Sequence, residues 1–169
     1  MGDCYSVDMR IKVAKGSKAG LADHMRRWMK RVEPRTDASP GVNWSWAMNR
    51  AHGARPCSMM GIARIILVAH QGGFSHTVDE YGYDVYRSCF NASYGWAGVI
   101  RDAFREMSRW IADGSSLYIS RDEGVDELEV KEGRIWQEED PDKREVPCAP
   151  AKRGGRKAAT GGRTRSAAR

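Results

Sequence analysis

Residues 5–13 read Tyr-Ser-Val-Asp-Met-Arg-Ile-Lys-Val, and apolar and polar side chains alternate through the whole stretch. Successive side chains of a β-strand point to opposite faces of a sheet. The alternation therefore predicts a strand with one buried and one solvated face.

Two amphipathic helices are predicted to supply the layer that covers such a strand. The first begins after Ser17, whose hydroxyl is a typical N-cap, and ends before Pro34, which has no backbone N–H. The second follows the capping residues 91–93 and ends at Asp113 and Gly114, and its apolar side chains fall within an arc of about 140°. Each helix has one apolar stripe, which needs a sheet face or the other helix to cover it.

The remaining elements are predicted to be strands. Val42–Met48 alternates and places Trp44 and Trp46 on one face, whereas the apolar run 59–69 fits a strand or a helix, with a strand favoured at its β-branched end. Further strands are predicted over residues 83–90, 117–120, 127–131 and 134–138, the last two joined as a hairpin through Glu132 and Gly133.

This order of elements predicts an α+β domain over residues 1–140. We expect a mixed or antiparallel sheet of about five or six strands with the two amphipathic helices on one face, a ferredoxin-like sandwich. Residues 141–169 are predicted to be a basic, flexible tail, because residues 147–169 contain no large apolar side chain with which to offset the entropy of ordering.

The net charge of +6 comes from the tail. Residues 143–169 carry nine Lys and Arg against a single acid, Glu145, so the rest of the chain is slightly acidic. Mobile cations bind phosphates without reading base sequence, because they release counterions. We therefore predict non-specific nucleic-acid contacts from the tail, through Lys152, Arg153, Arg156, Lys157, Arg163, Arg165 and Arg169.

Motifs for catalysis, metal binding and phosphate binding are not found. The sequence has no C-x-x-C pair, H-E-x-x-H, G-x-S-x-G, P-loop or G-x-G-x-x-G, so we expect no metal site and no cofactor. Cys89 is expected in the core of a strand. Two Cys–His pairs stay open as alternatives, Cys57 with His52 and Cys89 with His70.

The sequence favours a cytoplasmic protein. No apolar run approaches the roughly 20 residues that span a bilayer. The first residues lack a secretory pattern. Met-Gly-Asp-Cys formally matches an acylation motif, but Asp3 and the immediate start of the first strand disfavour it.

These observations favour a non-enzymatic binding protein that docks on a protein or nucleoprotein partner. We expect a small regulator or inhibitor of the kind that phages and mobile elements encode. The alternatives are a direct DNA- or RNA-binding protein and a small enzyme that uses a cysteine with a histidine. Partner-binding residues are expected in three places. These are the arginine row of the second helix (Arg101, Arg105 and Arg109), the tryptophan pair (Trp44 and Trp46), and the acidic stretch that follows the second helix (Asp126, Glu127 and Glu129).

Overall fold

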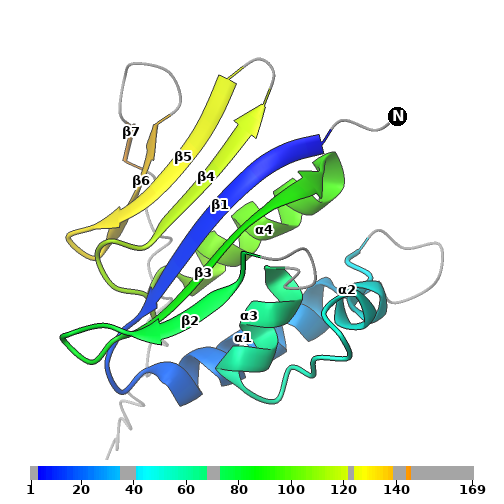
Figure 1. Cartoon of the computed structure of the whole chain (residues 1–169), viewed down its shortest axis with the longest axis horizontal. Helices are drawn as coiled ribbons and strands as arrows, with labels where there is room; N and C mark the ends of the chain where they lie inside the picture. The colour runs from blue at the N-terminus through cyan, green and yellow to red at the C-terminus, as the bar shows by residue number, and fades with distance from the viewer. Residues whose placement is uncertain (1–3, 35–40, 68–72, 122–123, 139–143, 146–169) are drawn as a thin grey trace, which may run out of the picture.

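The α+β class is confirmed by a computed structural model, in which an antiparallel sheet packs one face against four helices (Figure 1). The structure describes residues 4–34, 41–67, 73–121, 124–138 and 144–145. The sheet has seven strands in the order β2-β3-β1-β4-β5-β6-β7, which is more than the sequence predicts because two short strands lie at its edges.

Strand β1 (Cys4–Val13) lies inside the sheet and pairs with a neighbour on each side. Along its whole length it pairs with β3 (Asp84–Ser93), and its middle pairs with β4 (Ser116–Arg121). The predicted alternation is confirmed: Val7, Met9 and Ile11 have no exposed surface, while the residues between them lie on the other face. Ser115 fixes the end of β1 by accepting a hydrogen bond from the backbone N–H of Lys12, 2.9 Å away.

The other elements have these bounds: α1 (Lys18–Val32), α2 (Trp44–Arg50), α3 (Met59–Ile66), β2 (Ser75–Val78), α4 (Tyr94–Met107), β5 (Gly124–Lys131), β6 (Arg134–Glu138) and β7 (Arg144–Glu145). Helix α4 packs directly on β3, β1 and β4, and α1 packs on α4 and α3 (Figure 1). Strand β7 lies within the segment that the sequence assigns to the tail.

The strand predicted over Val42–Met48 is wrong, because these residues enter helix α2. The side chain of Asn43 accepts a hydrogen bond from the backbone N–H of Trp46 at 3.1 Å and caps the helix. Trp44, Ala47 and Ala51 are buried at helical spacing. Four alternating residues are too few to distinguish this spacing from that of a strand.

The strand favoured at the end of the apolar run is also wrong, because residues 59–66 form helix α3. Ser58 caps it by accepting a hydrogen bond from the backbone N–H of Gly61 at 3.2 Å. Five of its eight residues are buried, so the helix has too little polar surface to show its period. Residues 68–70 lie outside the described residues.

Prediction succeeds for the first helix and for the hairpin. Helix α1 ends before Pro34 as expected, although the Ser17 side chain makes no capping hydrogen bond. Glu132 and Gly133 both have positive φ, which is the geometry of the two-residue turn that suits a hairpin. The backbone N–H groups of this turn donate to the Asp113 carboxylate at 2.9 and 3.0 Å.

Two details at the ends of α4 differ from prediction. Strand β3 extends to Ser93 and runs straight into the helix, so residues 91–93 are extended and Ser93 makes no side-chain cap. The helix ends at Met107, and Ile111 forms an isolated β-bridge with Val13.

The helix layer includes a close contact between α1 and the segment after α4. A methyl group on Gly20 would lie 2.7 Å from Cη2 of the Trp110 indole. A methyl group on Gly98 of α4 would meet no atom within 4 Å. The two helical glycines thus differ in what an added side chain would contact.

We therefore expect Gly20→Ala and Gly98→Ala to change stability in opposite directions. Gly20→Ala forces the indole to move and lowers the free energy of unfolding by about 1–3 kcal/mol. Gly98→Ala removes backbone freedom from the unfolded chain and raises it by about 0.5–1 kcal/mol. Urea denaturation of both variants measures this difference, and stabilisation by Gly20→Ala would show that α1 does not pack on Trp110 as described.

Candidate functional site: the open face of the sheet

The face of the sheet opposite the helices is polar and uncovered within the described residues. In β1, β3 and β4, every second side chain is buried against the helices, and the side chains between them lie on this opposite face. Its central residues are Ser6, Asp8, Arg10 and Lys12 of β1, Arg87, Cys89 and Asn91 of β3, Ser116, Tyr118 and Ser120 of β4, and Val125, Glu127 and Glu129 of β5. We call this surface the open face.

A depression of about 440 Å³ lies in the middle of the open face. Four strands contribute to its lining, which consists of Asp8, Arg10, Arg87, Ser116, Tyr118 and Glu127. The strand pairing explains why these residues meet: Arg10 is directly opposite Arg87 and Ser116, and Tyr118 is directly opposite Asp8 and Glu127. Directly opposed residues of antiparallel strands have Cβ atoms about 5 Å apart.

The four charged groups of the depression differ in their partners. Arg87 donates to the Asp8 carboxylate through Nη2 at 2.8 Å and through Nε at 3.4 Å. Hydrogen bonding to Asp8, together with the negative charge of its carboxylate, raises the pKa of Arg87. Within the described part of the chain, the side chains of Arg10 and Glu127 have no hydrogen-bond or ion-pair partner. The depression therefore holds one cation and one anion that are not paired within it.

Aromatic surface lies between these charges. Tyr118 keeps 43% of its surface exposed in the centre of the open face. Tyrosine and arginine are enriched among the residues that contribute most to protein–protein binding, because they combine apolar area with directed hydrogen bonds. The centre of the open face has this composition.

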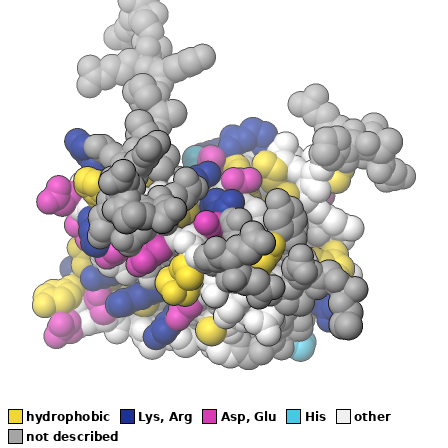
Figure 2. All heavy atoms as spheres, turned by 90° about the horizontal axis from the view of Figure 1, so that it is seen from above, with side chains coloured by type: hydrophobic (Ala, Val, Ile, Leu, Met, Phe, Trp, Pro, Cys, Tyr) yellow, Lys and Arg dark blue, Asp and Glu magenta, His cyan; other side chains and the backbone are white. Residues whose placement is uncertain are grey.

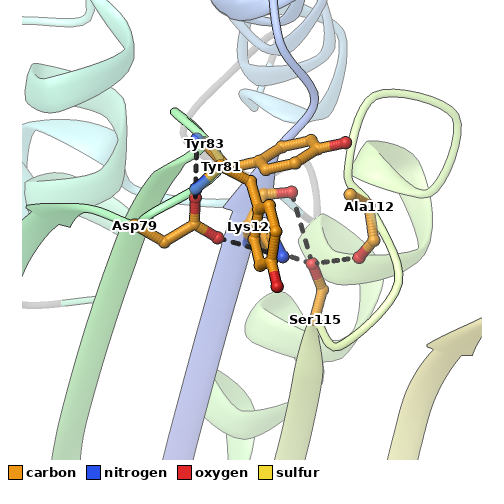
Figure 3. A network of polar contacts seen from close by, with 6 residues as sticks. All are labelled: Lys12, Asp79, Tyr81, Tyr83, Ala112 and Ser115. Atoms are coloured by element: carbon orange, nitrogen blue, oxygen red, sulfur yellow. Dashed lines mark hydrogen bonds and ion pairs between the residues drawn. The ribbon is translucent and has the colours of Figure 1, made fainter.

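A second aromatic group borders the open face at the β2–β3 turn (Figure 3). The Lys12 ammonium lies 3.0 Å from the Asp79 carboxylate and 4.4 Å from the centre of the Tyr83 ring. Burial opposes ionisation of Asp79, but backbone hydrogen bonds from Tyr83 and Tyr81 and the Lys12 ammonium outweigh it and lower the pKa. Lys12 is thus engaged in holding the turn, while Tyr81 remains 67% exposed.

Acidic and basic side chains are mixed on the side of the molecule that Figure 2 presents. Figure 2 shows them next to each other over the charged part of the side it presents. The surface visible there has no extended region of a single sign.

Two of the three arginines in the predicted row contact the sheet. Arg101 forms an ion pair with Asp126 of β5, and Arg105 donates to the Gln137 side chain at 2.7 Å. Arg109 is exposed in the turn that follows α4, and it has an interaction with another residue. Two residues that the sequence proposes as partner-binding groups, Arg101 and Asp126, thus contact each other.

The predicted tryptophan pair is divided between the core and the surface. Trp44 is buried, and its indole N–H donates to the Met29 carbonyl at 2.8 Å. Trp46 is 43% exposed and rests on Trp96, with ring centres 5.3 Å apart. The guanidinium carbon of Arg50 lies over the Trp46 ring, 5.7 Å from the ring centre.

The acidic stretch is divided too, since successive residues of a strand point to opposite faces. Glu127 and Glu129 lie on the open face, whereas Asp126 points toward α4. The eight predicted partner-binding residues do not share one surface. The seven predicted nucleic-acid-binding residues of the tail lie outside the described residues.

Cysteine chemistry gains no support from the positions of the thiols. The expectation that Cys89 belongs to the core is wrong, because the register of β3 turns its side chain to the open face. Cys57 is also exposed, and its thiol lies 3.7 Å from the Arg55 carbonyl. In the described ranges no hydrogen bond joins a cysteine to a histidine, and no three His, Cys, Asp or Glu side chains are placed to hold a metal ion. His70 lies outside these ranges.

A cluster of titratable groups lies near the start of α1, on the helix side of the sheet. The Asp84 carboxylate accepts from Lys18 at 2.8 Å and contacts His76 Nε2 at 2.7 Å. The His76 ring stacks on buried Tyr86 with ring centres 4.6 Å apart. The Lys18 hydrogen bond holds the pKa of Asp84 below its usual 3.8 against the effect of burial, and His76 adds to the shift. The cluster joins α1, β2 and β3, so we assign it to stability.

Since the folded protein lowers the pKa of Asp84, ionised Asp84 stabilises the fold above pH 3.8, and this stabilisation is lost as the pH falls through the folded value. We expect Asp84→Asn to lower the free energy of unfolding by about 1 kcal/mol at pH 7, since Lys18 is partly exposed. The difference from wild type should shrink below pH 3.8.

Unfolding curves from pH 7 to pH 3 measure this effect, with the exposed Glu80→Gln as the matched control. A difference between wild type and Asp84→Asn that stays constant over this range would contradict the assignment.

Comparisons with protein-family models, with curated proteins and with solved structures give no match for this chain. None of the described helices is long and apolar enough to cross a membrane.

Sequence reasoning identified only Glu127 among the six residues that line the depression. It missed the other five, which are Asp8, Arg10, Arg87, Ser116 and Tyr118. The alternation over residues 5–13 already places Asp8 and Arg10 on the polar side of a strand. Their convergence with residues near positions 87, 118 and 127 depends on strand order, which no local pattern specifies.

Proposed function

We propose that this chain is a non-enzymatic docking protein that binds a protein partner, free or within a nucleoprotein, through its open face. The observation that carries the proposal is the exposed Tyr118 beside two arginines, in a depression on a sheet face that the described helices leave uncovered. Such a protein acts by covering a surface of its partner, as a small regulator or inhibitor does.

The size of the open face supports this proposal. The face spans four adjacent strands, β3, β1, β4 and β5, or about 15 Å across at the usual spacing between strands. The long strands β1 and β3 extend it by about 30 Å. These dimensions give a projected area of about 450 Å², which is roughly half of the 800 Å² that each partner contributes to a standard protein interface, so the open face is large enough to form the centre of one.

The mixture of charges favours a protein over nucleic acid as the partner of this face. The acidic side chains of Asp8, Glu127 and Glu129 lie among the basic ones, and they would repel a phosphate backbone laid across the sheet. Contacts with nucleic acid are assigned instead to the basic tail, on its composition.

We also infer that the first four strands, with α1 and α4, form a ferredoxin-like unit. The chain order β1-α1-β2-β3-α4-β4 and the antiparallel sheet order β2-β3-β1-β4 support this inference. Helices α2 and α3 are then an insertion before β2, and β5, β6 and β7 extend the sheet beyond β4.

Affinity purification of the full chain from cells that encode it tests the docking function. Tyr118→Ala is compared with Trp46→Ala, because both side chains are 43% exposed and only Tyr118 lies on the open face. Loss of a central tyrosine removes about 2 kcal/mol of binding, so we expect partner recovery to fall at least about tenfold with Tyr118→Ala and to persist with Trp46→Ala.

The reverse pattern, with the partner lost only from Trp46→Ala, would contradict docking through the open face. Nuclease treatment of a parallel sample separates the classes of partner. A protein that remains bound after nuclease supports the proposal, whereas loss of all bound material would favour the direct DNA- or RNA-binding alternative.

A further inference from the structure

We infer that the depression in the open face receives an extended segment of the partner protein that carries an acidic and a basic side chain on either side of an apolar one. This inference rests on the proposed docking function and specifies the chemistry of the partner. The four charged groups of the depression and Tyr118 define this chemistry.

The charges that line the depression balance. Two arginines, Arg10 and Arg87, face two acids, Asp8 and Glu127. Arg87 and Asp8 already neutralise each other through two hydrogen bonds. Arg10 and Glu127 have no such partner within the described residues, so a ligand complementary to this site carries one negative and one positive group.

The position of Arg10 favours a carboxylate as the negative group. Arg10 is directly opposite Arg87 across the β1–β3 pair, where two like charges are mutually destabilising. Asp8 forms an ion pair with Arg87 and neutralises that charge, but it leaves the charge of Arg10 without a partner. A carboxylate that accepts from the planar Arg10 guanidinium neutralises the second cation, and it can do so through two parallel hydrogen bonds.

A phosphate group fits the same place less well. A phosphate dianion beside Arg10 would lie close to Asp8, which is the next residue of β1 on the same face. The repeated phosphates of a nucleic acid would also meet Glu127 and Glu129 of β5. The acids that border the site therefore select a singly charged group that is flanked by a cation.

The spacing of the unpaired charges predicts the spacing in the ligand. Arg10 and Glu127 lie two strands apart and one same-face step apart along the strand direction, which corresponds to about 12 Å between their Cβ atoms. Residues i and i+4 of an extended segment lie on one face and are about 13 Å apart. Residue i+2 then lies on the same face between them and meets the exposed Tyr118 ring.

Selection of a displayed random-peptide library on the immobilised full chain tests this inference. Wild type is compared with Arg10→Glu, with Tyr118→Ala, and with Arg27→Glu as a charge-matched control, because Arg27 is an exposed arginine of α1 away from the sheet. Circular dichroism of each variant verifies that the fold is retained.

Wild type and Arg27→Glu are expected to enrich the same peptides, with an acid, an apolar residue and a base at positions i, i+2 and i+4 in either chain direction. Binding of these peptides to Arg10→Glu should fall at least about tenfold. The peptides that Arg10→Glu itself selects should lack the acid.

Enrichment of uniformly acidic peptides, identical selection by wild type and Arg10→Glu, or no enrichment on wild type would overturn the inference. The proposed function has a separate readout. If Tyr118→Ala abolishes selection while the enriched peptides show no mixed charge, docking through the open face stands and the inferred chemistry is wrong. If Tyr118→Ala selects the same peptides as wild type, the proposed function itself fails.

Discussion

The position of β1 inside the sheet is the constraint on which the rest of the structure depends. Both edges of this strand are hydrogen-bonded, so its only free surfaces are its two faces. Val7, Met9 and Ile11 on one face have no exposed surface, so an apolar layer must cover that face. Helix α4 packs directly on β1 and forms this layer. Asp8 and Arg10 on the other face keep that side hydrated. A two-layer molecule with one open face follows from nine residues of alternating sequence.

The polar arrangement on the open face is not the one that stability alone would favour. Arg10 and Arg87 are opposed directly across two strands, and like charges in that position are destabilising. Other cations of the sheet and its helices have acidic partners, as Lys12 has Asp79 and Arg101 has Asp126. Residues kept for function often oppose local stability. The position of the unpaired Arg10 opposite Arg87 therefore supports the proposed binding role of the open face.

The sequence predicts elements correctly where the pattern is long and bounded by turn residues. Helix α1 has four turns before Pro34, and the β5–β6 hairpin has Glu132 and Gly133 at its tip. Prediction is wrong where the segment is short: α2 has seven residues, and buried α3 shows little polar surface to set its period. Strand β2 was missed because four mostly exposed residues carry no alternation. The site was missed because its residues come from strands whose order depends on the whole fold.

The chemical reactivity of Cys89 in the native protein tests the one-sided architecture most directly. Cys89 lies on β3 directly opposite Asp8, so its thiol is accessible only if the open face is uncovered. Native protein is treated with a neutral maleimide, and the modified cysteines are identified by peptide mapping, with exposed Cys57 as the internal reference. The account predicts that Cys89 reacts within about tenfold of the rate of Cys57. Modification of Cys89 only after unfolding would show that this face is covered, and would contradict the account.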